Sequence, residues 1–418
     1  MIEVTFIRMK RIYSIDFARG LVMIIMALDH TRDLLHINAM TQQPTDLSTT
    51  TPLLFFTRWI THFCAPVFVF LSGVSAYLSS RSRGSSDNQR SPDNRSDTNR
   101  PSSGNRRDAR ENRRFLLRRG IWLIFLEFTI VNFSLWCDIH FRLLLFEVIG
   151  TIGCGFVVLS LLYKVAPKIL GIAGLVLIFG HDLLSSVMLP ANPLLQFTGS
   201  FLMGPGAFQV TPHLLLVIGY PVLPWLGIML AGYGCGRLFE LPAGFRKTLF
   251  LRIGTAALSL FILLRCANLY GDPSPWKVQK NALFTFLSFI NFSKYPPSLL
   301  FTLVTLGGLF LLLAFMEGRS NQFTETVSVY GKTPLFYFLI HLIVIHAVMF
   351  IMVFGQGFRP ADLVFGPFKF GRPAAGSGIT LPYVYGVWLG VVAFLYPLCR
   401  WYGRYKESHR ENQWLRYL

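Results

Sequence analysis

Apolar residues in this chain gather in runs of about twenty, separated by short polar segments. An α-helix of about 20 residues is about 30 Å long, which matches the hydrocarbon core of a bilayer. We therefore predict an all-α polytopic membrane protein, a single-domain bundle over residues 1–418 with about ten transmembrane helices, some of them broken. The predicted spans lie near residues 12–36, 53–79, 116–136, 142–163, 168–188, 213–236, 249–270, 297–316, 333–355 and 382–400.

The low content of charged residues agrees with this prediction. The chain is 52% hydrophobic and 14% charged, whereas a soluble domain contains about 25% charged residues. In a soluble protein the net charge of +18 would suggest a nucleic-acid partner. Here much of the excess basic charge lies in one loop and beside the predicted helices, where anionic lipid and membrane topology explain it better. We therefore expect membrane lipid, and no nucleic acid, as a partner.

Basic residues gather in three segments that determine the predicted orientation. They are the N-terminus before residue 12, an Arg-rich loop at 79–114 and the C-terminus after residue 399. Because lysine and arginine are enriched in cytoplasmic loops, we place all three segments, and so both termini, in the cytoplasm. The loop at 79–114 contains almost no apolar residue and is predicted to be disordered. A solvated linker is the simpler interpretation of its arginines, and a site for an anionic cosubstrate is the alternative.

Cysteine spacing gives no indication of a metal site or a disulfide framework. The six cysteines are scattered, mostly within apolar runs, without a Cys-x-x-Cys motif or a Cys/His cluster. The first apolar run resembles a signal peptide in position only. It carries charges and lacks a small-residue cleavage site, so we interpret it as a retained first helix.

The first predicted span is unusual because it carries six ionisable residues. Each charge in or beside hydrocarbon costs about 2.5–3.5 kcal/mol on insertion scales, and such residues usually face the interior of a bundle and mark a functional site. A polar patch that holds helices together is the alternative, but six such groups in one helix favour function. They are Asp16, Arg19, Asp29, His30, Arg32 and Asp33.

Helical geometry places four of these residues on one stripe. Arg19 and His30 are separated by eleven residues, which corresponds to about 20° of rotation and roughly 16 Å of rise. Asp16 and Asp33 lie near the two ends of the same stripe. Asp33 follows His30 by three residues and is the better intrahelical partner, whereas Asp29 points about 100° away. A histidine beside a carboxylate can act as a general base.

The second and ninth spans add further candidate residues. Arg58 and His62 are four residues apart on one helix face, and the depths of His30 and His62 place both in one chamber in the outer half of the membrane. In the ninth span His341 lies about 12 Å from the cytoplasmic side. Lys332 stands at the cytoplasmic mouth of that span, where it could meet a phosphate of a cosubstrate or simply snorkel to the interface.

Proline pairs interrupt two of the apolar segments. Pro221 and Pro224 fall in the sixth span, and Pro296 and Pro297 precede the eighth, with Lys294 beside them at the outer interface. Broken helices within a membrane usually line a cavity.

Five motifs, in order along the chain, resemble a known family. The pattern R-I-x-S-I-D-x-x-R-G-L-x-x-x-x-M-x-x-D-H at 11–30 resembles the membrane acyltransferases related to heparan-alpha-glucosaminide N-acetyltransferase, and the bacterial group in particular. The other four motifs are HFCAPVFVFLSG at 62–73, YPVLPW at 220–225, KYPPSLLF at 294–301 and GKTPLFYFLIH at 331–341. The spacing of Arg19 and His30 also resembles a second acyltransferase superfamily, in which that histidine is regarded as catalytic.

This resemblance implies transfer of an acetyl or other acyl group from cytoplasmic acyl-CoA to a hydroxyl or amine acceptor, such as a sugar or glycan, at the outer face. It implies acetyl-CoA as cosubstrate, no metal, and an integral protein of the bacterial cytoplasmic membrane, for which we consider a homodimer. The heparan enzymes have Asn where His30 falls and Asp where His62 falls, so the sequence leaves open which histidine acts.

In the resulting hypothesis His30 deprotonates the acceptor or carries the acyl group transiently, and Asp33 or Asp29 orients its imidazole. Arg19, Arg58 or His62 stabilises charge on the thioester oxygen. We predict Asp29, His30, Asp33 and His62 as catalytic residues, and Arg19, Arg58, Lys332 and His341 as residues that bind substrate or CoA.

Two other functions suit the same sequence. A proton-coupled secondary transporter also combines broken helices with intramembrane Asp and His. A structural subunit of an envelope polysaccharide system would need neither His30 nor Asp33. Binding of CoA to the purified protein separates the acyltransferase from the transporter.

Overall fold

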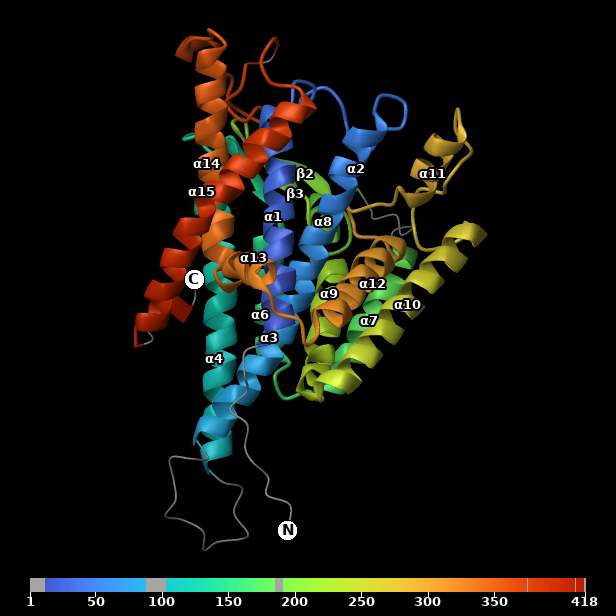
Figure 1. The fold of residues 1–418 in the computed structure, drawn as a ribbon, viewed down its shortest axis with the longest axis vertical. Helices are drawn as coiled ribbons and strands as arrows, with labels where there is room; N and C mark the ends of the chain where they lie inside the picture. The colour runs from blue at the N-terminus through green and yellow to red at the C-terminus, as the bar shows by residue number, and fades with distance from the viewer. Residues whose placement is uncertain (1–11, 88–102, 185–190, 374, 410, 417–418) are drawn as a thin grey trace, which may run out of the picture.

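The computed structural model describes residues 12–87, 103–184, 191–373, 375–409 and 411–416. It is a bundle of helices in which α1 (Tyr13–Leu35) runs through the middle, beside α3, α13, α14 and α15 (Figure 1). Six helical segments among the described residues are long and apolar enough to cross a membrane. The chain is therefore a helical protein of the membrane type.

Each of the ten predicted spans contains a helix. In chain order the helices there are α1, α2 (Pro52–Ile60) with α3 (Cys64–Asp87), α4 (Ser103–Leu126) with α5 (Asn132–Trp136), α6 (Val148–Leu161), α7 (Pro167–Leu184), α9 (Val222–Cys235), α10 (Ala243–Ala267), α12 (Leu299–Met316), α14 (Pro334–Gly355) and α15 (Leu381–Ser408). Shorter helices connect them, namely α8 (Pro193–Leu202), α11 (Ala282–Ile290) and α13 (Gln322–Lys332).

Local sequence explains several helix starts. The Thr51 hydroxyl accepts the amide of Leu54 at the start of α2, where proline occupies the first helical position. The Ser298 hydroxyl caps α12 in the same way. At α13, Asn321 and Thr324 form a capping box. These caps satisfy amides that have no partner within the helix.

A small sheet departs from the all-α prediction. Strands β1 (Leu143–Phe146), β3 (Leu214–Ile218) and β2 (Gly206–Thr211) form it in that order, with β1 parallel to β3 and β2 antiparallel to it. Residue Leu143 pairs with Leu215, and Phe146 with Ile218. The predicted spans at 142–163 and 213–236 each begin with one of these strands, because a short apolar run cannot be assigned to strand or helix by hydropathy alone.

The predicted disordered loop at 79–114 is helical at both ends. Helix α3 continues to Asp87 and α4 begins at Ser103, both at the lower end of the molecule (Figure 1). The part of the loop at 88–102 lies outside the described residues, and its disorder stays a prediction.

Glycines on both sides of one contact let α3 and α9 approach closely. A Cβ atom at Gly73 of α3 would collide with the carbonyl oxygen of Met229 in α9, and one at Gly232 of α9 would collide with that of Phe70 in α3. Small residues at contacts of this kind are typical of helix packing in membranes.

Candidate active site

A cavity of about 140 Å³ lies beside the C-terminal half of α1. Its walls come from α1, the α2–α3 segment, the junction of β1 and α6, the loop before α12, and α14. A cavity of this size holds a group about as large as benzene, so a larger ligand would place only one edge in it. Its charged and histidine lining residues are Asp29, His30, Asp33, Arg58, Glu147 and Lys294.

Ion pairs hold the acidic residues of α1 in place. Arg58 of α2 pairs with Asp29, and the same carboxylate accepts a hydrogen bond from Arg32 at 2.8 Å. Arg32 also donates to Asp33 at 2.5 Å. Its side chain is 3% exposed, so this is a charge network inside the protein. Removing one member of such a network leaves an uncompensated charge.

Two histidines meet at this cavity. The rings of His30 in α1 and His341 in α14 have their centroids 5.2 Å apart. The His341 ring stacks on Tyr337, and its Nδ1 lies 3.1 Å from the carbonyl oxygen of that residue. Its Nε2 is buried and has no hydrogen-bond partner among the described residues. A buried polar atom without a partner is costly, so this nitrogen is available to a bound group.

The other predicted site residues lie elsewhere. Arg19 donates to the carbonyl oxygen of Leu71 at 3.0 Å and to the Ser75 hydroxyl, and so ties α1 to α3. His62 is buried against the rings of Phe292 and Phe301, outside the cavity lining. Lys332 is exposed at the end of α13. Four of the eight predicted residues line the cavity, namely Asp29, His30, Asp33 and Arg58, and a fifth, His341, contacts the ring of His30.

Sequence reasoning missed Glu147 and Tyr220 and did not place Lys294 and Tyr295 in the site. All four side chains line the cavity. One signal existed for Glu147, since it is the one acidic residue in the predicted span at 142–163. Its position after β1 depends on the sheet, which hydropathy did not show.

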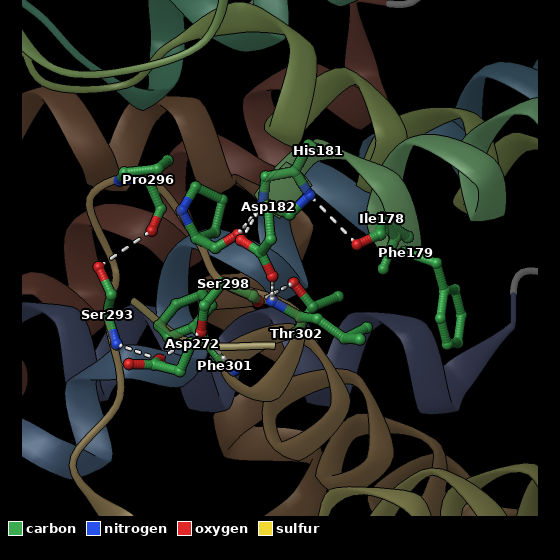
Figure 2. A network of polar contacts seen from close by, with 12 residues as sticks. Ile178, Phe179, His181, Asp182, Asp272, Ser293, Pro296, Ser298, Phe301 and Thr302 are labelled. Atoms are coloured by element: carbon green, nitrogen blue, oxygen red, sulfur yellow. Dashed lines mark hydrogen bonds and ion pairs between the residues drawn. The ribbon is translucent and has the colours of Figure 1, made fainter. Parts of the chain in front are cut away.

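The loop that carries Lys294 is fixed on both sides by polar contacts (Figure 2). The Asp272 carboxylate accepts the amide of Ser293 at 2.8 Å and the hydroxyl of Ser298 at 2.7 Å. His181 of α7 bonds through Nε2 to the carbonyl oxygen of Pro297 at 2.8 Å. Burial raises the pKa of Asp272, and the hydrogen bonds from the two serines oppose this. The loop is thereby held rigidly at the edge of the cavity.

No group of three or more His, Cys, Asp or Glu side chains in the described part of the chain is arranged to hold a metal ion. The histidine and carboxyl groups that line the cavity can form hydrogen bonds and transfer protons.

Comparison with known proteins gives one family. The family model described as heparan-alpha-glucosaminide N-acetyltransferase, catalytic, matches residues 11–270, more than half of the chain. The match includes Asp29, His30, Asp33, Arg58 and Glu147, whereas Lys294 and His341 follow it. No curated protein matches the chain.

Proposed function

The chain belongs to the heparan-alpha-glucosaminide N-acetyltransferase catalytic family, and on this basis we propose that it is a transmembrane acyltransferase. It transfers an acetyl group from cytoplasmic acetyl-CoA to a hydroxyl or amine of a sugar or glycan at the outer face. The observation that carries the proposal is the cavity within the helical bundle, where His30 meets His341 beside the paired charges of Asp29, Arg32 and Arg58.

His30 is the general base of the proposed reaction. Its imidazole takes the proton of the acceptor O–H or N–H while that oxygen or nitrogen attacks the carbonyl carbon of the thioester. A C–O or C–N bond forms and negative charge moves to the carbonyl oxygen, which Arg58 stabilises from the cavity wall. When the intermediate collapses, the C–S bond breaks and the proton on His30 passes to the sulfur of CoA.

The acidic residues keep this machinery in place. Asp29 holds Arg58 and Arg32 by ion pairs, so the Arg58 guanidinium has a fixed position before the substrates bind. Asp33 lies on the same cavity wall, with its side chain 38% exposed, and supports the positive charge that His30 gains during the reaction. A preorganised charge of this kind needs little rearrangement at the moment of reaction.

The donor enters from the end of the molecule at which α1 begins. The last turn of α3, the first turn of α4 and the last turn of α15 lie on this side of the molecule (Figure 1). Basic residues concentrate in these same parts of the sequence, which the positive-inside rule assigns to the cytoplasm. We infer about ten membrane crossings, both termini in the cytoplasm, and Lys332 and Arg19 along the path of the CoA arm.

Binding of acetyl-CoA to the purified full-length protein tests the proposal. We expect calorimetry to detect binding, and the His30→Ala variant to bind acetyl-CoA within about twofold of the parent protein. When sugars are added, the parent protein should release free CoA thiol and the variant should not. A protein that binds no CoA would instead fit a transporter of small solutes. Equal thiol release by the variant would remove His30 from the mechanism.

A further inference from the structure

Two side chains of opposite charge on the cavity wall belong to none of the ion pairs described above. Glu147 and Lys294 both line the cavity, and neither forms an ion pair with any other residue that the structure describes. Lys294 is only 9% exposed. The ionised partners on α1 and α2 already neutralise one another. Lys294 is buried and Glu147 is half-buried, and neither is held by an ion pair, so a ligand in the cavity can hydrogen-bond to both.

Glu147 owes its position to a second buried carboxylate. Glu127, which is 0% exposed, lies on a π-helical turn (Glu127–Val131) and accepts the amides of Glu147 at 3.0 Å and Gly150 at 2.7 Å. Glu127 therefore caps the start of α6, and the Glu147 carboxylate is left for the cavity. Asn132, which follows this turn at the start of α5, bonds to both the amide and the carbonyl oxygen of Leu145. Turns of π-helix occur frequently at functional sites.

Lys294 has an independent support. The contacts of Asp272 and His181 fix the loop at Ser293, Pro297 and Ser298, on either side of the lysine (Figure 2). The Lys294 Nζ lies 5.1 Å from the centre of the Tyr295 ring. Two separate hydrogen-bond networks thus present one carboxylate and one ammonium group to the same small space, which indicates a built binding site.

The chemistry of this wall selects among acceptors. An ammonium group on the acceptor would bond to Glu147 but be repelled by Lys294. A carboxylate would bond to Lys294 but be repelled by Glu147. A hydroxyl group donates one hydrogen bond and accepts others, so a sugar with neighbouring hydroxyls satisfies both residues. The rings of Tyr220 and Tyr295, with centroids 5.4 Å apart, add an apolar surface of the kind that packs against a sugar ring.

We propose that Glu147 and Lys294 form an acceptor subsite that binds a neutral sugar and presents one of its hydroxyl groups to His30. This inference rests on the proposed acyltransferase function and specifies that the acceptor atom is oxygen. Glu147 accepts a hydrogen bond from one hydroxyl of the sugar and Lys294 donates to a neighbouring one, and neither residue exchanges a proton in the reaction.

Sugar binding to charge-neutralised variants tests the subsite without any turnover. The probes are methyl α-glucoside, glucosamine and glucuronate, and the readout is the Kd of each from thermal stabilisation of the purified full-length protein. The parent protein should prefer the neutral glucoside. In the E147Q variant Lys294 remains charged, so the ratio of the Kd for glucosamine to the Kd for glucuronate should rise at least about tenfold. In the K294Q variant the same ratio should fall by a similar factor.

Glu325 and Lys280 are exposed and provide matched controls. The E325Q and K280Q variants should keep the sugar preference of the parent protein. If E147Q fails to fold, K294Q alone still gives a signed prediction. The subsite is refuted if no probe binds the parent protein, or if both variants shift in the same direction or by less than about twofold. If the sugars bind as expected but no acetyl group is ever transferred to them, the proposed function fails and the subsite stands.

Discussion

At the scale of single residues, the site depends on charged side chains that are buried together with a partner of opposite charge. Asp29 is shared between Arg58 of α2 and Arg32 of its own helix. The Arg58 side chain is 15% exposed, so its charge would be poorly solvated without the carboxylate. A buried ion pair of this kind contributes to function by placing a charge, whereas its net contribution to stability is small.

Loss of one partner from this pair should be more damaging than loss of both. We predict that Arg58→Met lowers the free energy of unfolding by about 3–5 kcal/mol, because Asp29 loses one of its two cations. Adding Asp29→Asn to this variant should restore part of the loss. Thermal unfolding of the two variants in detergent measures the difference.

Arg81 supplies the matched control, since it pairs with Glu240 at 3.2 Å while 65% exposed. Arg81→Met should change the stability by no more than about 1 kcal/mol. If Arg58→Met is as mild as this control, the charge network does not stabilise the site.

The sequence was sufficient to identify part of the site at this scale. Asp29, His30, Asp33 and Arg58 stand out because charge is rare inside apolar runs. The pairing of His30 with His341 was not predictable, since it depends on which faces of α1 and α14 meet. Sequence depth alone placed His62 in the chamber, and could not show that its ring packs against Phe292 and Phe301.

At the scale of elements, close helix contacts determine where the site residues stand. The crossing of α3 and α9 requires Gly73 and Gly232. Glycine residues in apolar helices were visible in the sequence, as were the ten helical ranges. The pairing of β1 with β3 was not, because it joins segments about seventy residues apart. Since β1 leads directly to Glu147, missing the sheet meant missing that residue.

A larger side chain at the α3–α9 contact should separate these two helices. We predict that Gly232→Leu destabilises the protein by several kcal/mol (about 3 or more), because the new side chain meets the backbone of Phe70. Gly390→Leu in α15 is the control, because a Cβ atom there meets nothing within 4 Å. Unfolding temperatures of the two variants in the same detergent provide the comparison. Equal values would show that the glycine contact is dispensable.

At the scale of the whole molecule, the proposed reaction requires a defined orientation. We propose that the basic ends of the chain lie on the donor side and the loop that carries Lys294 on the acceptor side. We predict that green fluorescent protein fused after residue 418 fluoresces in a bacterial host, because it folds in the cytoplasm. Alkaline phosphatase at the same position should be inactive. A fusion protein that does not fluoresce, together with an active phosphatase, would show that the C-terminus lies outside the cytoplasm.

Acetyl transfer across a membrane tests the proposed function most directly. Purified protein in vesicles receives radiolabelled acetyl-CoA only on the side of the termini, and methyl α-glucoside and glucosamine only on the other side. We predict a labelled sugar, formed at a rate that His30→Ala lowers at least about 100-fold and that Glu325→Gln leaves unchanged. Undiminished transfer by His30→Ala, or transfer only when donor and acceptor share one side, would contradict this prediction.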